Sequence, residues 1–288
     1  MEYVLHLATL FCIFAIFAVS LDLVAGYTGL VSLSHAAFWG IGAYTTALLM
    51  QDMGMNFFLA LILGVIMTGI VAFLVGLVFS RFSGDYYVLG TVGFTYIAYT
   101  VFINWQSVTG GPLGVPGILR PELFGFVFFD SVSFLVLCLV ALAGIYLLSR
   151  WIISSPFGRV LTAIREDEKA ISVFGYRTLH FKLLIFVISA AMAAVGGALY
   201  ASYFTYIDPT SFALTESIFV LSMVILGGLG SLRGPLLGAL ILVLLPEALR
   251  FVGFTPDIAA QMRSLTYGVL LVVMMLYRPQ GFLGKYKL

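Results

Sequence analysis

The side chains that could do chemistry are few and widely separated in this sequence. His6, His35 and His180 lie in different segments, without the spacing that a metal site requires. Cys12 and Cys138 each lack a neighbouring cysteine or histidine, so both are interpreted as small core residues. No His-Glu-x-x-His or Gly-x-Ser-x-Gly motif occurs. These patterns predict no catalytic residue, no metal site and no cofactor.

Three carboxylates lie within or beside long apolar stretches, where charge is costly and often functional. Asp22 is close to the end of the first stretch, Glu216 opens a later one, and Glu247 follows a proline inside another. An interfacial or helix-capping position is the first interpretation of each residue. The alternative is an ion site, which an ion-coupled secondary transporter would need.

The elements that must position these residues belong in a bilayer. Of the 288 residues, 62% are hydrophobic and only 9% are charged, whereas soluble domains carry about 25% charged residues. Apolar runs of about 20 residues recur, which is the length that a helix needs to cross the hydrocarbon core. The composition excludes a soluble enzyme, and the net charge of +1 argues against nucleic acid as a partner.

We predict an all-α, polytopic membrane bundle that forms one transmembrane domain over residues 1–288. Barrel strands would alternate in hydropathy over about ten residues, and these runs do not. About eight or nine hydrophobic segments are expected, at residues 3–25, 31–50, 57–79, 86–104, 131–150, 181–204, 214–227, 234–252 and 262–277. The 214–227 segment is too short to span alone, which indicates a broken or re-entrant helix.

The positions of lysine and arginine predict the orientation of the bundle. Six of the 14 basic residues lie within 150–182, and others lie at Arg81 and near the C-terminus. Because cytoplasmic loops are enriched in these residues, the three regions are predicted to be cytoplasmic. The 105–130 connection has Arg120 as its one basic residue and is predicted to be external.

Two glycine-rich stretches interrupt the apolar pattern, one near each end of the chain. Each combines a Gly-x-x-Gly turn with a nearby serine. Paired interruptions in the two halves of a transporter point to a solute pathway, while tight helix packing is the alternative. The candidate pathway residues are Gly26, Gly29, Ser32, Ser34, His35, Gly227, Gly228 and Gly230.

The segment at about 154–180 differs from its surroundings because charged residues alternate there with an apolar stripe. Pro156 can start a helix and Gly175 can end one. We predict one or two short amphipathic helices on the cytoplasmic side. They are either a docking element or a solvated connector whose basic residues fix the topology.

This segment resembles the coupling segment of permease subunits of ATP-binding-cassette importers, whose pattern is Glu-Ala-Ala-x-x-x-Gly. Glu168, Ala170 and Gly175 match the pattern, although Lys169 replaces the first alanine and the glycine falls one residue late. The stretches Gly26–Tyr44 and Met223–Gly238 and the ending Arg-Pro-Gln-Gly-Phe at 278–282 extend the resemblance. Together they resemble the LivM family of branched-chain amino acid permeases from about residue 20 to 284.

The resemblance implies a multi-pass subunit of the cell inner (plasma) membrane, in contact with lipid and with its C-terminus in the cytoplasm. Its implied partners are a second permease of the LivH type, two cytoplasmic ABC ATPase subunits and an extracytoplasmic substrate-binding protein. Because no Gly-x-x-x-x-Gly-Lys-Ser/Thr phosphate loop occurs, the chain itself is not expected to hydrolyse ATP.

The resemblance also implies a role for the charged segment in coupling to the ATPase. Glu168 and Arg165 would make polar contacts in the groove of a motor subunit, and Ala170 and Ile171 would add apolar anchoring. The full set of implied coupling residues is Arg159, Arg165, Glu166, Glu168, Ala170, Ile171 and Gly175. Branched-chain amino acids, other neutral amino acids, urea and short amides all remain open as substrates.

Overall fold

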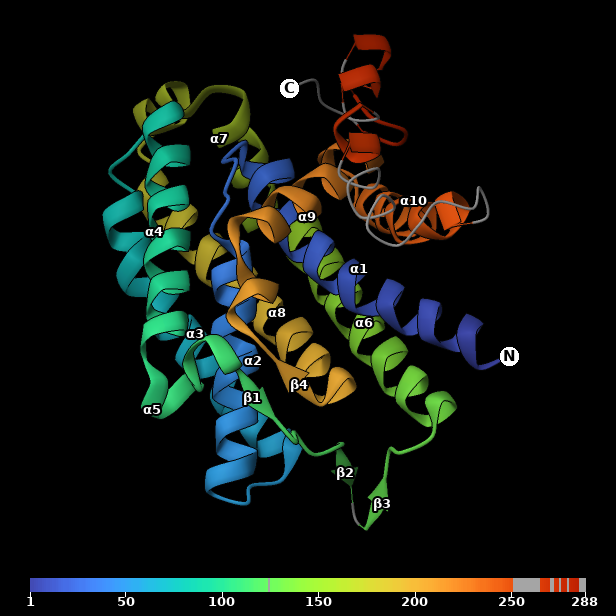
Figure 1. Cartoon of the computed structure of the whole chain (residues 1–288). Helices are drawn as coiled ribbons and strands as arrows, with labels where there is room; N and C mark the ends of the chain where they lie inside the picture. The colour runs from blue at the N-terminus through green and yellow to red at the C-terminus, as the bar shows by residue number, and fades with distance from the viewer. Residues whose placement is uncertain (124, 251–264, 270–271, 275, 279, 285–288) are drawn as a thin grey trace.

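The computed structural model describes residues 1–123, 125–250, 265–269, 272–274, 276–278 and 280–284. Helices make up most of these ranges (Figure 1). They are α1 (Glu2–Thr28), α2 (His35–Asp52), α3 (Phe57–Phe79), α4 (Asp85–Asn104), α5 (Gln106–Thr109), α6 (Ser131–Ser154), α7 (Pro156–Val173), α8 (Thr178–Phe204), α9 (Leu214–Gly227) and α10 (Arg233–Arg250). The predicted helical membrane bundle is confirmed at this level.

Within the described residues, five helices are long and apolar enough to cross a membrane: α1, α3, α4, α6 and α8. Five of the predicted eight or nine hydrophobic segments are therefore confirmed as candidate spans. Helix α9 has 14 residues and is about 21 Å long, which is less than the roughly 30 Å of a bilayer core. The predicted 262–277 helix lies partly outside the described residues, and those described within 265–277 are helical.

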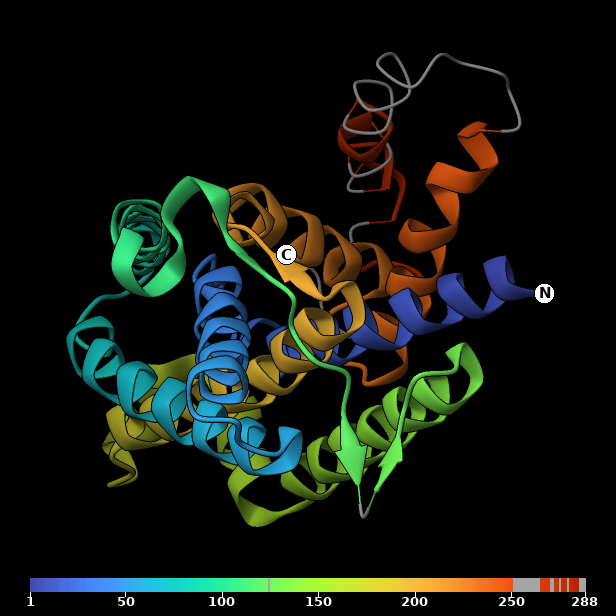
Figure 2. The ribbon, with the colours of Figure 1, turned by 60° about the horizontal axis from the view of Figure 1, so that its bottom comes forward.

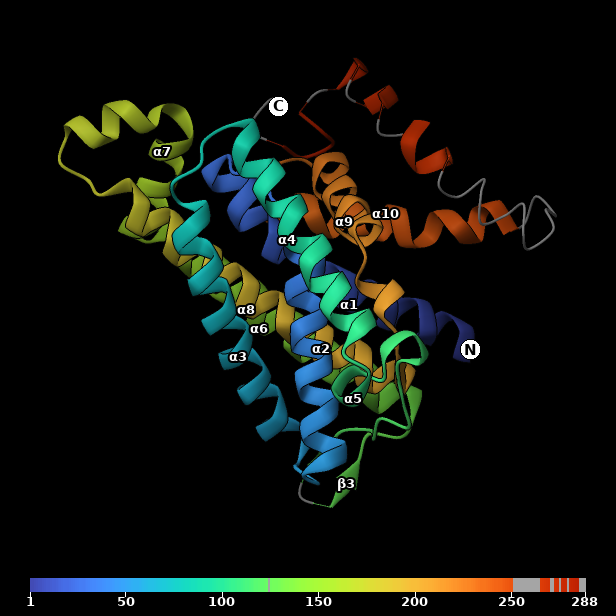
Figure 3. The same cartoon turned by 60° about the vertical axis from the view of Figure 1, so that its left-hand side comes forward.

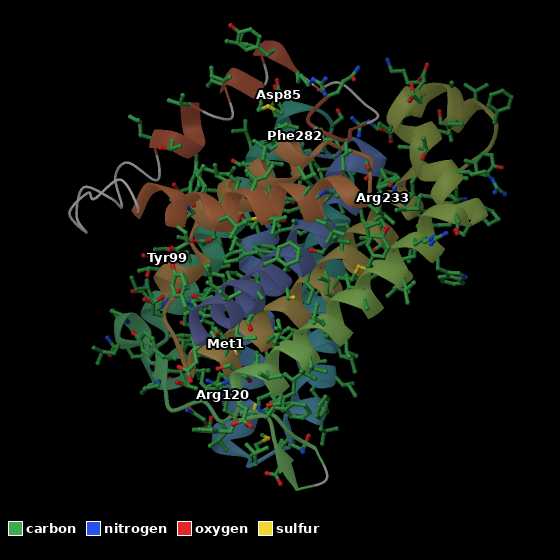
Figure 4. The ribbon with its side chains drawn as sticks, turned by 90° about the vertical axis from the view of Figure 1, so that its right-hand side faces the viewer. Met1, Asp85, Tyr99, Arg120, Arg233 and Phe282 are labelled. Atoms are coloured by element: carbon green, nitrogen blue, oxygen red, sulfur yellow. The ribbon has the colours of Figure 1, made fainter. Side chains whose placement is uncertain are left out.

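The connections separate into two ends of the bundle. At one end, the turn after α3 and the start of α8 line a common groove with α7. At the opposite end, Gln51 Nε2 donates to the Pro116 carbonyl over 2.6 Å, and Asn56 Nδ2 donates to the Glu122 carbonyl over 2.7 Å. Figure 4 shows the same division, with Asp85 and Phe282 in the upper part and Arg120 in the lower. The predicted grouping of the connections agrees with this arrangement.

Helix α2 lies inside the bundle, where it packs along α8 and α3 (Figure 2). Small residues make the close approach possible: a Cβ on Gly42 would lie 2.5 Å from the Ala194 Cα atom. Trp39 of α2 is 1% exposed, and its ring stacks on Phe17 of α1 with centroids 4.9 Å apart. This central helix fixes the positions of its neighbours.

The outer faces of α3, α4 and α6 carry large apolar side chains, as a bilayer solvent requires. Leu74, Leu89 and Val140 are each more than half exposed. Helix α7 extends away from this apolar belt at one end of the bundle (Figure 3). The surface therefore has an apolar belt and a polar end.

Two small antiparallel sheets, which the sequence pattern did not predict, lie at the end opposite α7. In the first, β1 (Val115–Pro116) pairs with β4 (Tyr206–Ile207), and Val115 lies opposite Ile207. In the second, β2 (Glu122–Leu123) pairs with β3 (Phe126–Val127). A short 3₁₀ turn, η2 (Pro209–Phe212), follows β4 and carries the fully buried Phe212 into the bundle. The first sheet thus joins the connection after α4 to the end of α8.

Candidate functional site

The two glycine-rich interruptions come into direct contact in the folded chain. Gly26 lies in the last turn of α1, and a Cβ atom there would lie 2.5 Å from the Gly230 nitrogen. The Asp22 carboxylate, one turn earlier, accepts a hydrogen bond from the Gly230 N–H over 3.0 Å. Residues 208 positions apart in the sequence are therefore joined at one point.

Asp22 is fully buried, with 0% of its surface exposed. Helix α1 continues for another turn and a half beyond it, and α9 and α10 pack against α1. Its second oxygen, Oδ2, has no hydrogen-bond partner in the described part of the chain. A buried carboxylate inside a membrane bundle is costly, so we expect it to have a functional reason.

Arg165 of α7 reaches into the bundle and contacts the end of α1. Its Nη1 atom donates to the carbonyl of Gly26 and, over 3.4 Å, to that of Ala25. The carbonyls of a last helical turn have no partner within their own helix, and a cation there also complements the helix dipole. Gly29 ends α1 in the left-handed conformation, with φ 72°. Arg165 therefore contacts the end of α1, and its predicted contact with a motor subunit stays a prediction.

The chain between α1 and α2 forms a buried polar loop. Ser32 and Ser34 are fully buried, and their hydroxyl oxygens lie 2.8 Å apart. The intervening Leu33 backbone is held by α4: its N–H donates to Thr91 Oγ1 over 3.1 Å, and its carbonyl accepts from Thr95 Oγ1 over 2.7 Å. Polar partners therefore replace helical hydrogen bonds where the sequence predicted a continuous helix from residue 31.

The first residues of α2 are hydrogen-bonded to α8 and α9, and through α8 to α1. His35 Nε2 lies 2.6 Å from Ser189 Oγ of α8, and Ser189 also donates to the carbonyl of Ser20 in α1. The Ala36 N–H donates to Ser217 Oγ of α9 over 3.0 Å. Ser189 is near the middle of α8, so α2 begins deep in the bundle. The predicted pathway residues Ser32, Ser34 and His35 thus form a polar junction.

The second interruption is closely packed against other glycines. Gly227 lies directly against the backbone of Gly234, and a Cβ atom on Gly228 would lie 2.5 Å from the Gly284 Cα atom. Gly230 contacts the first interruption, as described above. The geometry favours close packing for Gly227 and Gly228, which was the alternative to a pathway role.

The turn at residues 280–284 completes the end of α9. The N–H of Phe282 donates to the Leu226 carbonyl over 3.0 Å, and that of Leu283 donates to the Gly227 carbonyl over 2.8 Å. These bonds supply partners for carbonyls that α9 cannot satisfy itself. At the second interruption, α9 and α10 therefore pack against each other and against the 280–284 turn.

Helix α7 occupies most of the segment predicted at 154–180. Ser155 precedes it and accepts a hydrogen bond from the Gly158 N–H over 3.3 Å, with Pro156 at the first position. Asp167 divides the helix, because its φ of −155° and ψ of 99° are not helical. Its carboxylate accepts from the Ala170 N–H over 3.0 Å, so a second short helix begins there.

Glu168 is paired within the chain. Its Oε2 atom lies 2.6 Å from Lys182 Nζ on the first turns of α8, where the lysine side chain is 6% exposed. The pair fixes the second half of α7 against α8. Lys182 was not among the predicted site residues, because a lone lysine at the start of an apolar helix carries no pattern.

The other predicted coupling residues face outward or lie near the surface. Arg159, Glu166, Ala170 and Gly175 are exposed and Ile171 is half-buried. Beyond them, Val173 is 85% exposed and Phe174 is 79% exposed. We call these last two residues the α7 tip. Exposed apolar side chains at the polar end of a bundle are typical of a protein contact.

Among the described residues, no group of three or more histidines, cysteines, aspartates or glutamates is placed to hold a metal ion. Instead, a side chain of the exposed helix α7 reaches the buried contact among Asp22, Gly26 and Gly230, which we call the buried joint. Arg165 and Asp22 lie at the two sides of Gly26, and Gly230 completes the contact. Such a chain of contacts can transmit movement of α7 to the centre of the bundle.

A family model described as "Branched-chain amino acid transport system / permease component" matches residues 3–277. The chain belongs to this family of permease components. The LivM permease protein of Escherichia coli K12, named as part of a high-affinity branched-chain amino acid transport system, is 35% identical over 96% of this chain and 69% of its own length. No solved structure matches the chain.

Two further relatives show the breadth of the family. A probable LivM permease protein of Methanocaldococcus jannaschii is 28% identical over 77% of this chain and 68% of its own length. The LivH permease protein of Salmonella typhimurium is 27% identical over 96% of this chain and 93% of its own length. The chain is therefore similar to both permease types, and more similar to LivM.

Proposed function

We propose that this chain is the LivM-type permease subunit of an ATP-binding-cassette importer for branched-chain or other neutral amino acids. Its relatives are named as permease components of such amino acid transport systems. The observation that carries the mechanism is that Arg165 of the exposed helix α7 reaches Gly26, where α1 meets Gly230. The α7 tip lies beyond the break at Asp167, and the Glu168–Lys182 pair ties that part of α7 to α8. Two ATPase subunits, a LivH-type permease and a substrate-binding protein complete the transporter.

In this proposal α7 and the C-terminus face the cytoplasm of a cell with an inner membrane. Arg81, Lys182 and the basic residues of α7 lie at one end of the bundle, in agreement with the positive-inside rule. An ATPase pair bound at this end would push on α7 when it closes on ATP. The helices tied to α7 would then tilt as rigid elements and switch the pathway between outward-facing and inward-facing states.

The buried joint sets the place where the bundle rearranges. The Asp22–Gly230 hydrogen bond connects α1, the first helix, with the turn between α9 and α10. Glycines at positions 26, 227 and 228 let backbones approach there without side chains between them. We propose that this joint, with the polar loop at residues 29–35, lies beside the pathway and opens with it.

The α7 tip gives a direct test of ATPase docking. Phe174→Asp places a charge on a surface that we expect an ATPase groove to bury, so stimulation of ATP hydrolysis by the loaded binding protein should fall about tenfold or more. Phe174→Leu keeps an apolar side chain and should retain most of it. The measurement is ATPase activity of the reconstituted transporter. Normal stimulation in Phe174→Asp would place the docking surface elsewhere.

A further inference from the structure

A cavity of about 320 Å³ lies among α1, α9, α10 and residue 267, away from the joint described above. Its size falls in the range of about 300–1,000 Å³ that is typical of small-molecule sites. The apolar part of the wall comes from Leu10, Leu242 and Val243. The polar part comes from Thr215 and Glu216 at the start of α9.

Glu216 brings an unsatisfied carboxylate to this cavity. Its Oε2 atom is buried and has no hydrogen-bond partner among the described residues. A carboxylate that lacks partners in an apolar bundle is costly to bury, and such residues usually face a solute or ion pathway. A positively charged hydrogen-bond donor would satisfy it.

Aromatic rings line the same cavity. Phe219 lies 4.9 Å from Tyr267 and 5.5 Å from Phe14, measured between ring centroids. Ring faces attract ammonium groups, and a carboxylate beside them favours the same ligand. Tyr267 is further fixed by its hydroxyl, which donates to the Leu242 carbonyl over 3.3 Å. That carbonyl is free of helical bonding because Pro246, four residues on, has no N–H.

The depth of Glu216 indicates where the ammonium group comes from. The neighbouring Ser217 accepts from the Ala36 N–H, and His35 contacts Ser189 near the middle of α8. Glu216 therefore lies near mid-depth in the bundle, whereas lipid headgroups lie about 15 Å from the bilayer midplane. A solute in transit reaches this depth more readily than a headgroup does.

We propose that this cavity binds the ammonium group of an apolar amino acid, with Glu216 as the anion and Phe14, Phe219 and Tyr267 as the aromatic wall. The identity of the ammonium compound rests on the proposed function. Leu10, Leu242 and Val243 supply the apolar contacts that a branched side chain would fill. The site selects for the amino group and is a waypoint of the substrate on its way through the membrane.

Equilibrium binding to the purified full chain in phosphatidylglycerol nanodiscs tests this site with three probes. L-leucine carries both charges, isoamylamine lacks the carboxylate, and 4-methylpentanoate lacks the ammonium group. We expect the two probes with an ammonium group, L-leucine and isoamylamine (the two amines below), to bind. 4-Methylpentanoate should bind at least about tenfold more weakly. Equal binding of isoamylamine and 4-methylpentanoate, or no binding of either amine, would overturn the proposal.

The matched variants are Glu216→Gln and Glu122→Gln, the latter in an exposed connection. We expect Glu216→Gln to weaken the binding of both amines about tenfold or more, and Glu122→Gln to leave it unchanged. Phe219→Leu keeps the carboxylate and should weaken binding several-fold through loss of a ring face. Unchanged amine binding in both Glu216→Gln and Phe219→Leu would place the ligand elsewhere.

A lipid occupant and a failed transport function give different results. If phosphatidylethanolamine in the nanodisc abolishes amine binding, a lipid headgroup occupies the cavity and the proposed solute is wrong. If Glu216-dependent amine binding occurs but the complete transporter moves no L-leucine, the site stands and the proposed function fails. If the transporter works and Glu216→Gln binds amines normally, the site alone fails.

Discussion

Arg165→Ala should uncouple ATP hydrolysis from amino acid uptake. The guanidinium group holds the carbonyls of Ala25 and Gly26 at the end of α1, and hydrogen bonds to charged groups contribute about 1.5–3 kcal/mol each. Without them, α7 can move while α1 stays in place. We expect the amount of L-leucine taken up per ATP hydrolysed to fall about tenfold or more, because one tenfold step needs about 1.4 kcal/mol.

The measurement is simultaneous uptake and ATPase activity in proteoliposomes that contain the complete transporter. Arg165→Lys keeps the charge but loses the planar fork, so an intermediate ratio is expected. Arg177→Ala removes an exposed arginine at the start of α8 and should leave the ratio unchanged. An Arg165→Ala transporter with the wild-type ratio would show that coupling bypasses this contact.

Gly238→Ala should destabilise the fold strongly. A Cβ atom on Gly238 of α10 would overlap the Met223 carbonyl of α9 and lie 3.0 Å from the Gly227 nitrogen. Because these are backbone atoms, the two helices must separate, and overpacking of this kind costs about 1–3 kcal/mol. The thermal unfolding midpoint of the purified chain in detergent should fall by about 5 °C or more.

Gly144→Ala is the matched control, since this glycine is also in a helix interior. No atom lies within 4 Å of a Cβ atom built on Gly144 of α6. Alanine stabilises a helix by roughly 0.5–1 kcal/mol relative to glycine, so the midpoint should stay constant or rise. If both variants behaved alike, the close contact between α9 and α10 would not be important for stability.

Several helix boundaries could be predicted from residues next to them in the sequence. The predicted helix at 57–79 matches α3, whose preceding Asn56 side chain accepts from the Phe58 N–H. The predicted helix at 214–227 matches α9. Pro156 begins α7, and Gly175, with φ 87°, lies just beyond its end. Such signals act over a few residues, so a single sequence reveals them.

Distant contacts determined what the sequence could not show. The predicted start at residue 31 was wrong because Leu33 bonds to Thr91 and Thr95 of α4, and helix α2 begins only at His35. The partner of Asp22 could not be foreseen either, because Gly230 lies 208 positions further along the chain. Strands of two residues are too short for any alternation in hydropathy.

The structure gives the predicted site residues contacts that the sequence pattern did not show. Arg165 was selected for its charged surroundings, which do not reveal that it points inward to Gly26. Glu168 was selected by its match to a family pattern, which does not reveal that it pairs with Lys182. Ser189 and Ser217 were missed, because single serines in apolar helices usually bond to their own backbone. The two glycine-rich stretches were selected separately, and their mutual contact was not foreseen.

The energy source of uptake tests the central claim most directly. Proteoliposomes containing the complete transporter are supplied with ATP and radiolabelled L-leucine, with and without a protonophore and with and without the ATPase subunits. We expect uptake that requires the ATPase subunits and hydrolysed ATP and that continues in the protonophore. Uptake that stops in the protonophore at constant ATP, or proceeds without the ATPase subunits, would instead indicate an ion-coupled transporter.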